Sequence, residues 1–244
     1  MNSASASSRP ITRFVILFHG RCGASYLRSL LNSHPRIHTF GETLVGHQNS
    51  NQQLAKARLR LTVDLDTQLH AVGFKTKFRD LLNFRSFSAL LHTMDCRVIY
   101  LRRRNWVKWA VSWQNAIRLN ASQGKWNLKS QDEDLGPISI DPELFHEWLD
   151  NVPGLLQSSD EAIRSMRIPV LRLQYEQFLV ELHTTMNKVF SFLGVRPAEI
   201  SSEFKKNTND DLRRVVENFD DTTLRRAQEL ILSWLVASGN TGED

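Results

Sequence analysis

The sequence has few cysteines and no long apolar run, and these two absences exclude several classes of protein. Its 244 residues include only two cysteines, Cys22 and Cys96. So few thiols exclude a disulfide framework and are typical of a reducing compartment. No segment has the roughly 18 consecutive apolar residues that a membrane-spanning helix needs. Residues 1–10 are rich in Ser and Ala and lack the apolar core of a secretory signal, so we expect a disordered tail there and a cytoplasmic protein.

The sequence also lacks the patterns that mark metal sites and nucleotide-triphosphate loops. Its eight His and two Cys residues have no spacing typical of a metal site, so we expect no metal cofactor. The Gly-rich turn at residues 19–23 does not end in the Gly-Lys-Ser/Thr that binds phosphates and Mg²⁺ in kinases and GTPases. An ordinary kinase or GTPase function is therefore disfavoured.

The composition of the chain predicts one folded domain, expected over residues 11–240, that binds anions. Hydrophobic residues make up 41% of the chain, enough for a large core, and the formal net charge is +5. A basic protein suits a polyanionic partner, but charge alone does not choose between nucleic acid, an anionic membrane and a nucleotide.

Strand-like and helix-like patterns alternate along the chain. Strands are predicted at 14–18, 71–74, 97–101 and 169–173. Helices are predicted at about 26–31, 51–69, 80–93, 106–119 and 142–166, with Pro153 expected to break or kink the last of them. The alternation predicts an α/β fold with a central parallel sheet flanked by helices. The polar segment 120–136 is predicted to be a long mobile loop, a candidate lid.

Four polar side chains lie just past the four predicted strands. They are Arg21, Lys75, Arg103 and Tyr175. Ligands of parallel sheets bind at the carboxyl ends of the strands, so we expect these side chains to lie along one edge of the sheet. The first strand leads through the Gly-rich turn into a helix, an arrangement that points backbone N–H groups and a helix dipole at an anion.

This strand, turn and helix resemble the 5′-phosphosulfate loop of sulfotransferases that use 3′-phosphoadenosine 5′-phosphosulfate (PAPS). Members often read R-S-G-[ST]-[ST]-x-L-x-x-L-L-x-x-H-P, and this chain matches from Arg21 to Pro35. Cys22 and Ala24 depart from the pattern, because small hydroxyl residues usually stand there. The resemblance implies a P-loop-like fold and a donor-binding loop made of Arg21, Cys22, Gly23, Ala24, Ser25 and Tyr26. The thiol of Cys22 is interpreted as a replacement for Ser and not as a nucleophile.

The segment from Arg97 to Ala116 resembles the 3′-phosphate element of the same family, in which a strand ends in Arg and a Ser follows about nine residues later. Arg103 and Ser112 take these places, and an Arg can hold a phosphate with two parallel hydrogen bonds. Arg102 and Arg104 are alternatives, and a solvated basic patch is the plainer interpretation of the three. The match is closest to bacterial members, including those that act on nodulation factors.

Other matches are shorter. The resemblance implies that Tyr175 lies near the adenine, although a core tyrosine is an equal interpretation. Lys75 is either a cation facing the sulfate or an ion-paired lysine at a strand end. Lys206 belongs to a segment, residues 205–218, that resembles the part of the family closing over the cofactor.

The acceptor hydroxyl must lose its proton, so the reaction needs a base. Glu42 matches a carboxylate that sugar-modifying bacterial members carry, and it can act as a base if its pKa rises. His38 is the alternative base, and Arg21 is expected to neutralise charge on the leaving oxygen.

The chain is thus identified as a PAPS-dependent sulfotransferase. It is expected to transfer a sulfuryl group to a hydroxyl, or less commonly an amine, of a small-molecule or carbohydrate acceptor, leaving 3′-phosphoadenosine 5′-phosphate (PAP). No nucleic-acid partner is expected. Two alternatives stay open: a P-loop kinase-like phosphotransferase, and a non-catalytic nucleotide- or RNA-binding protein.

Overall fold

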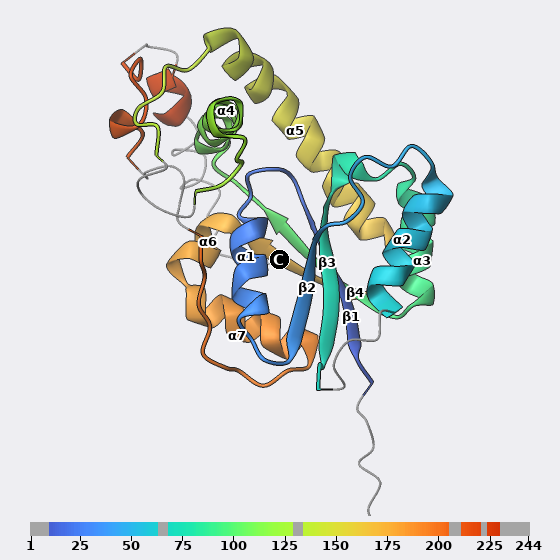
Figure 1. The fold of residues 1–244 in the computed structure, drawn as a ribbon. Coiled ribbons are helices and arrows are strands. Elements are labelled where there is room, and N and C mark those ends of the chain that lie inside the picture. Colours follow the sequence, from blue (N-terminus) through green and yellow to red (C-terminus); the bar gives the residue numbers. More distant parts are fainter. Residues whose placement is uncertain (1–9, 63–67, 129–133, 205–210, 221–223, 230–244) are drawn as a thin grey trace, which may run out of the picture. The chain divides into compact units, whose positions relative to one another are not determined.

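The computed structural model describes residues 10–62, 68–128, 134–204, 211–220 and 224–229. The chain divides into two compact units, which are described separately (Figure 1). The first unit comprises residues 1–19, 23–102 and 162–202, and the second comprises residues 20–22, 103–161 and 203–244. Among the described residues, no helix has both the length and the apolar character needed to cross a bilayer.

The first unit is built on a five-stranded, all-parallel sheet with the strand order β2-β3-β1-β4-β5. The strands are β1 (Thr12–Phe18), β2 (Ile37–Glu42), β3 (Ala71–Lys77), β4 (Cys96–Arg102) and β5 (Val170–Gln174). The predicted α/β fold with a central parallel sheet is confirmed, and each of the four predicted strands overlaps one of these. The fifth, β2, was missed because it is an edge strand that alternates apolar and polar residues and contains a glycine.

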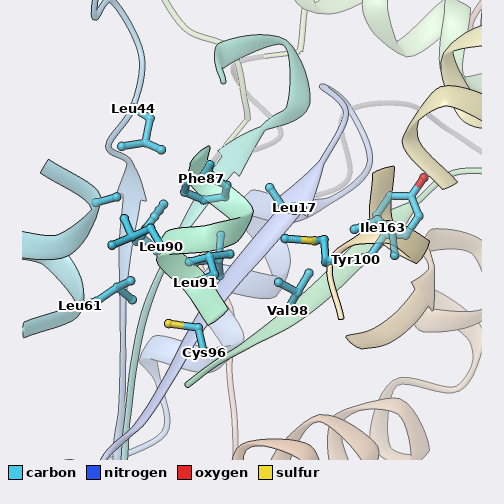
Figure 2. Close-up of a cluster of buried hydrophobic side chains, with 14 residues drawn as sticks. Leu17, Leu44, Leu61, Phe87, Leu90, Leu91, Cys96, Val98, Tyr100 and Ile163 are labelled. Carbon is cyan, nitrogen blue, oxygen red and sulfur yellow. The ribbon is translucent and has the colours of Figure 1, made fainter. Parts of the chain in front are cut away.

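Helices cover both faces of this sheet (Figure 1). One face carries α1 (Ala24–Asn32), α6 (Tyr175–Val180) and α7 (Leu182–Leu193), and the other carries α2 (Ser50–Thr62) and α3 (Phe84–Thr93). Apolar side chains of the strands pack against α2 and α3 in a continuous core (Figure 2), which includes Leu17, Leu61, Phe87, Leu91, Val98 and Tyr100. Burial on both faces explains why β1 and β4 read as unbroken apolar runs.

The observed ends of two helices differ from the predicted ends, because capping residues set where each helix begins or stops. The helix predicted from residue 80 begins at Phe84, because the side chain of Asn83 accepts a hydrogen bond from the N–H of Ser86 and caps it. Residues 78–80 form a separate 3₁₀ turn, η1 (Phe78–Asp80). In the second unit α4 (Trp106–Gln123) continues into the predicted loop and ends only at Gly124, whose φ of 67° closes it. The first residues of the predicted lid are therefore helical, and residues 129–133 lie outside the described part.

The second unit is mainly helical. It contains α4, residues 142–161 of α5 (Pro142–Ser165) and a 3₁₀ turn, η3 (Leu212–Arg214). Its core comprises Val107, Ala110, Val111, Ile138, Ile140, Phe145, Leu212, Val216, Phe219 and Leu224. The side chain of Asn218 accepts from the N–H of Ile140 and donates to its carbonyl oxygen, both at 2.9 Å, and this clamp gives Asn218 a structural role.

Helix α5 confirms one prediction and corrects another. It starts at residue 142 as predicted, and the carboxylate of Asp141 caps it by accepting from the N–H groups of Glu143 and Leu144. Of the two effects expected at Pro153, a break is wrong, because the helix runs through this residue, and a kink stays a prediction. Proline removes one hydrogen bond, but Val152 and Leu156 are buried on either side of it. Their packing holds the helix together.

The close contact between β1 and β3 predicts that Gly73 tolerates no side chain. A Cβ at Gly73 would lie 2.3 Å from the carbonyl oxygen of Phe14. We expect Gly73→Ala to lower the free energy of unfolding by about 1–3 kcal/mol in urea denaturation. Gly41→Ala is the matched control, since a Cβ there meets no atom within 4 Å, and it should change stability by less than about 0.5 kcal/mol. Equal losses in the two variants would contradict the packing argument.

Candidate functional site

The turn after β1 directs the chain sharply into α1. Arg21 has a φ of 66° and Gly23 a φ of 81°, so two left-handed residues lie within three positions. The left-handed backbone conformation costs a residue with a side chain, such as Arg21, about 1–3 kcal/mol of conformational free energy. Such strain is concentrated at functional sites. Gly23 caps α1 without a side-chain hydrogen bond. The first N–H groups of a helix have no intrahelical partner, so the predicted anion-binding geometry is present at the start of α1.

Tyr175, the first residue of α6, packs against this turn. A Cβ on Gly23 would lie 2.5 Å from the ring of Tyr175, so any residue other than glycine would displace that ring. The structure thus brings together two residues that the sequence predicted for donor binding. Tyr26 turns its ring to Phe178, with 5.5 Å between ring centroids, and burial raises the pKa of its hydroxyl. Its hydroxyl therefore stays neutral.

A second group of predicted residues meets on the α1 face of the sheet. The ammonium of Lys75 donates to Ser25 Oγ at 2.8 Å and to Glu42 Oε1 at 3.1 Å. The other carboxylate oxygen of Glu42 accepts from Lys77, whose Nζ also lies 3.7 Å from Asp80 Oδ2. We call these five residues the Lys75–Glu42 cluster. Lys75 is only 7% exposed, so its charge depends on these partners.

A β-bulge brings Glu42 to Lys75. Phe40 of β2 pairs with Phe74 of β3, but the register then shifts so that Glu42, and not Gly41, pairs with Lys75. Without this extra residue Glu42 would pair with Thr76 and point to the opposite face of the sheet, because strand side chains alternate. The bulge thus decides whether the carboxylate meets the lysine.

The cluster sets the protonation of its carboxylate. Burial raises the pKa of Glu42, but the charge of Lys75 and the hydrogen bond and charge of Lys77 outweigh burial, and the pKa is lowered overall. Burial lowers the pKa of Lys75, and Glu42 opposes that shift. Glu42 is therefore firmly ionised here, whereas the sequence argument for a base required its pKa to rise.

His38 lies apart from this cluster. It pairs with Val72, so its side chain points to the α2 and α3 face, where its ring lies 4.4 Å from that of Phe40. Burial, followed by the charges of Arg28 and Arg60, lowers its pKa. His38 is consequently neutral at physiological pH, but the structure does not bring it together with Lys75 or Glu42.

In the second unit, Arg21 contacts the predicted 3′-phosphate element. Its Nε donates to Ser112 Oγ at 3.3 Å, and its Nη1 donates to the carbonyl oxygen of Trp126 and to Asn127 Oδ1. Arg103 is 4% exposed and donates to the carbonyl oxygen of Arg21 at 3.1 Å. The structure thus brings Arg21, Arg103 and Ser112 together.

Other sequence predictions have plainer outcomes. Cys22 is fully buried, as a small residue in a tight turn should be. Arg102 and Arg104 are half-buried, and Lys206 lies outside the described residues. Within the described ranges no three His, Cys, Asp or Glu residues are grouped so that they could hold a metal ion.

Sequence reasoning missed two residues that complete these groups. Lys77 follows Lys75 by two positions, and residues two apart on a strand share a face, so this spacing could have revealed it. Trp109 donates from Nε1 to the carbonyl oxygen of Gly20 at 2.6 Å. No sequence signal distinguishes this tryptophan from the others on α4.

The lowered pKa of Glu42 predicts a pH-dependent contribution to stability. A carboxylate with a folded-state pKa below its unfolded value stabilises the fold above the unfolded pKa, and this contribution is lost as pH falls through the folded pKa. We expect Glu42→Gln to be less stable than the wild type at pH 7 in urea denaturation, with the difference shrinking below about pH 4.

Glu199→Gln is the control for this titration, because Glu199 is exposed and has no ion pair in the described part of the chain. The stability of Glu199→Gln should differ little from that of the wild type both at pH 7 and below about pH 4. A Glu42→Gln difference that does not change with pH would show that the carboxylate charge contributes nothing.

Comparison with known proteins identifies the family. Residues 12–228 match the family described as "Sulfotransferase domain". A crystal structure of a sulfotransferase from Alicyclobacillus acidocaldarius is 17% identical, with a TM-score of 0.53, over 91% of this chain and 96% of that one. Mouse sulfotransferase SULT7A1, solved with PAP, is 14% identical, with the same TM-score, over 91% and 84% of the respective chains. No curated protein matches.

The family match covers most of the chain and extends over both units, and the two solved structures agree with it in fold. The predicted closeness to enzymes acting on nodulation factors has no support in these comparisons. The kinase-like and non-catalytic alternatives are disfavoured. The chain belongs to the sulfotransferase family, and its chemistry is sulfuryl transfer.

Proposed function

We propose that the sulfuryl donor is PAPS, that PAP is the product, and that the acceptor group is a hydroxyl on a small molecule or carbohydrate. The observation that carries this proposal is the hydrogen bond between Lys75 and Ser25 at the start of α1. It supplies a cation and a hydroxyl beside free backbone N–H groups, which is the set of donors that a phosphosulfate needs. Residues 21–26 would bind the 5′ end of the donor.

Arg103 and Ser112 are proposed to bind the 3′-phosphate. Both are buried and both contact Arg21, by its carbonyl oxygen and its Nε respectively. A guanidinium and a hydroxyl can together make three hydrogen bonds to one phosphate. Tyr175, packed on Gly23, would stack near the adenine, and Lys206 would close over the bound nucleotide.

Transfer requires an in-line displacement at sulfur. The acceptor oxygen forms a bond to sulfur while the bond from sulfur to the oxygen of the 5′-phosphate breaks. Arg21 would neutralise the negative charge that develops on the departing phosphate oxygen. Lys75 would be the cation that faces the sulfuryl group. The acceptor proton would pass to Glu42, with His38 as the alternative base.

The lowered pKa of Glu42 is compatible with this role if the donor changes its surroundings. Two lysines hold the carboxylate before the donor binds. An anionic sulfuryl group at Lys75 would share the charge that now stabilises Glu42, and its pKa would rise toward the range of a useful base. Ion pairing thus keeps Glu42 ionised until the donor arrives.

Transfer of ³⁵S-labelled sulfate from PAPS to compounds of a metabolite extract tests this function directly. We expect labelled product and stoichiometric PAP without added metal. Adenosine 5′-phosphosulfate, which lacks the 3′-phosphate, is the control donor and should react far more slowly. Transfer of labelled phosphate from Mg²⁺-ATP with no sulfate transfer would overturn the proposal.

The assignment of Arg103 predicts that the protein discriminates PAP from AMP. Losing a charge-assisted phosphate contact should cost on the order of 2–4 kcal/mol, so calorimetry should show PAP binding far more tightly than AMP. Arg103→Ala should remove most of this difference, and the neighbouring control Arg104→Ala should preserve it. Equal affinity of the wild type for the two ligands would refute the 3′-phosphate assignment.

The assignment of Glu42 as base predicts a loss in the chemical step. Glu42→Gln keeps the size of the side chain but cannot accept the proton, so single-turnover rates should fall roughly 10²–10⁴-fold, with PAP affinity nearly unchanged. If the Glu42→Gln variant turns over at a near-native rate and the His38→Ala variant is inactive, the general base is His38 and not Glu42. A loss of PAP binding in Glu42→Gln would instead show that Glu42 organises the lysines.

A further inference from the structure

A glutamine of α2 is buried where an apolar residue is expected. Gln53, Ala57 and Leu61 follow one another at intervals of four residues, so they share one face of the helix, and none of them is more than 3% exposed. Ala57 and Leu61 belong to the core between α2, α3 and the sheet (Figure 2). An amide in such a place is costly unless its donors and its acceptor are satisfied. The partners of Gln53 therefore indicate what the residue does.

All three side-chain hydrogen bonds of Gln53 go to the backbone of two loops. Its amide nitrogen donates to the carbonyl oxygen of Leu44 at 3.0 Å and to that of Asp80 at 2.6 Å. Its amide oxygen accepts from the N–H of Leu82 at 3.1 Å. Leu44 lies just past the end of β2, and Asp80 and Leu82 follow the end of β3. One side chain thus ties together the segments that leave two neighbouring strands.

These two segments begin at opposite sides of the Lys75–Glu42 cluster. Glu42, the last residue of β2, accepts from Lys75 and Lys77 of β3. Lys77 also lies 3.7 Å from Asp80 Oδ2. Besides burial, the positive charge of Arg28 on α1 lowers the pKa of Lys75. The spacing of the two segments therefore sets how closely the carboxylate of Glu42 meets its lysines.

The end of β2 needs such support, because the strand is weakly held there. β2 is an edge strand with a neighbour on one side only. The register shift between Phe40 and Glu42 interrupts its pairing with β3. A Cβ at Gly41, inside this bulge, would meet no atom within 4 Å, so close packing does not fix the bulge. Gln53 attaches the chain to α2 directly after this weak point.

We propose that Gln53 is a positioning residue, which fixes the segment after β2 against the segment after β3 and thereby holds Glu42 on Lys75 and Lys77. This inference rests on the proposed function, in which Glu42 is the base, and adds a residue that acts through Glu42. All of these residues belong to the first unit. Losing Gln53 should loosen the carboxylate and leave the donor loop as it is.

The protonation of Glu42 tests this role without donor or acceptor. Gln53→Met keeps the volume of the side chain but removes all three hydrogen bonds, and it changes none of the charged groups around Glu42. Lys77 should then hold the carboxylate less closely, so the pKa of Glu42 should rise toward the ordinary value of a glutamate. The carboxyl signal can be followed by NMR in protein labelled with ¹³C-glutamate, and it is assigned by its absence in Glu42→Gln. It should titrate at a higher pH in Gln53→Met than in the wild type.

Two variants of the same helix are the controls. Gln52→Met changes the exposed neighbour, whose side chain makes no hydrogen bond within the described ranges. Leu61→Ala opens a cavity farther along the buried face and destabilises the protein, but it removes no hydrogen bond to either loop. In both variants Glu42 should titrate as in the wild type. An unchanged titration in folded Gln53→Met, or an equal shift in Leu61→Ala, would overturn the specific role of Gln53.

Kinetics test whether the same change reaches the chemical step. At saturating PAPS, transfer of labelled sulfate to a metabolite extract should fall roughly 10–10²-fold in Gln53→Met, because the base is no longer held in place. The KM for PAPS and the affinity for PAP should change little, since the side-chain hydrogen bonds of Gln53 all go to the two loops. A loss confined to PAP affinity would place Gln53 in donor binding and refute the positioning of Glu42.

The two readouts separate this inference from the function on which it rests. If Glu42 titrates at a higher pH in Gln53→Met but the wild type transfers no sulfate, the positioning role stands and the proposed function fails. If both proteins transfer sulfate equally and titrate alike, the function stands and the positioning role fails.

A second variant covers the case in which Gln53→Met does not fold. Gln53→Asn keeps the amide but is one methylene shorter, so it cannot span both loops, and it should shift the titration of Glu42 in the same direction. Failure of both variants to fold would show that the fold itself requires Gln53, and the narrower role of positioning Glu42 would be wrong.

Discussion

The burial of Lys75 at the carboxyl end of β3 is the constraint on which the candidate site depends. An ammonium that is 7% exposed is stable only with a nearby anion and hydrogen-bond acceptors. The bulge in β2 supplies Glu42, the first turn of α1 supplies Ser25, and Lys77 shares the carboxylate. The edge strand β2, its neighbour β3 and helix α1 are therefore joined at one charged cluster, which is also where an anionic donor would bind.

The loop after β1 meets a second constraint, which is lack of space. Gly20 lies against Trp113 of α4 within the second unit, and Gly23 lies against Tyr175 within the first. Arg21, between them, adopts a left-handed conformation and has its carbonyl oxygen bound by Arg103. The glycines thus serve close packing as well as the turn, and the family resemblance at Gly23 has a steric cause.

The charges around Glu42 alter what can be concluded from the prediction that it is the base. A carboxylate next to the loop reads as a base, but in the folded chain two lysines lower the pKa of Glu42. Base strength then becomes a property of what else occupies Lys75. Coupling of this kind depends on contacts between residues 33 positions apart, so no local pattern reveals it.

The sequence by itself determined the α/β class, four of the five strands and the family, because continuous apolar runs, the Gly-rich turn and the R-x-G-x-S spacing are local features that depend little on context. It also indicated Arg21, Lys75, Arg103 and Tyr175 as one group of residues just past the predicted strands. It missed β2, whose mixed polarity follows from its edge position, and it wrongly allowed a break at Pro153, where buried neighbours maintain the helix. Only the tertiary structure decided that Glu42 and not His38 meets Lys75, because a single bulged residue chooses the face of the sheet. Likewise, only the tertiary structure brings Trp113, Trp148 and Glu147 around one pocket, because the packing of α4 against α5 has no signature in the sequence.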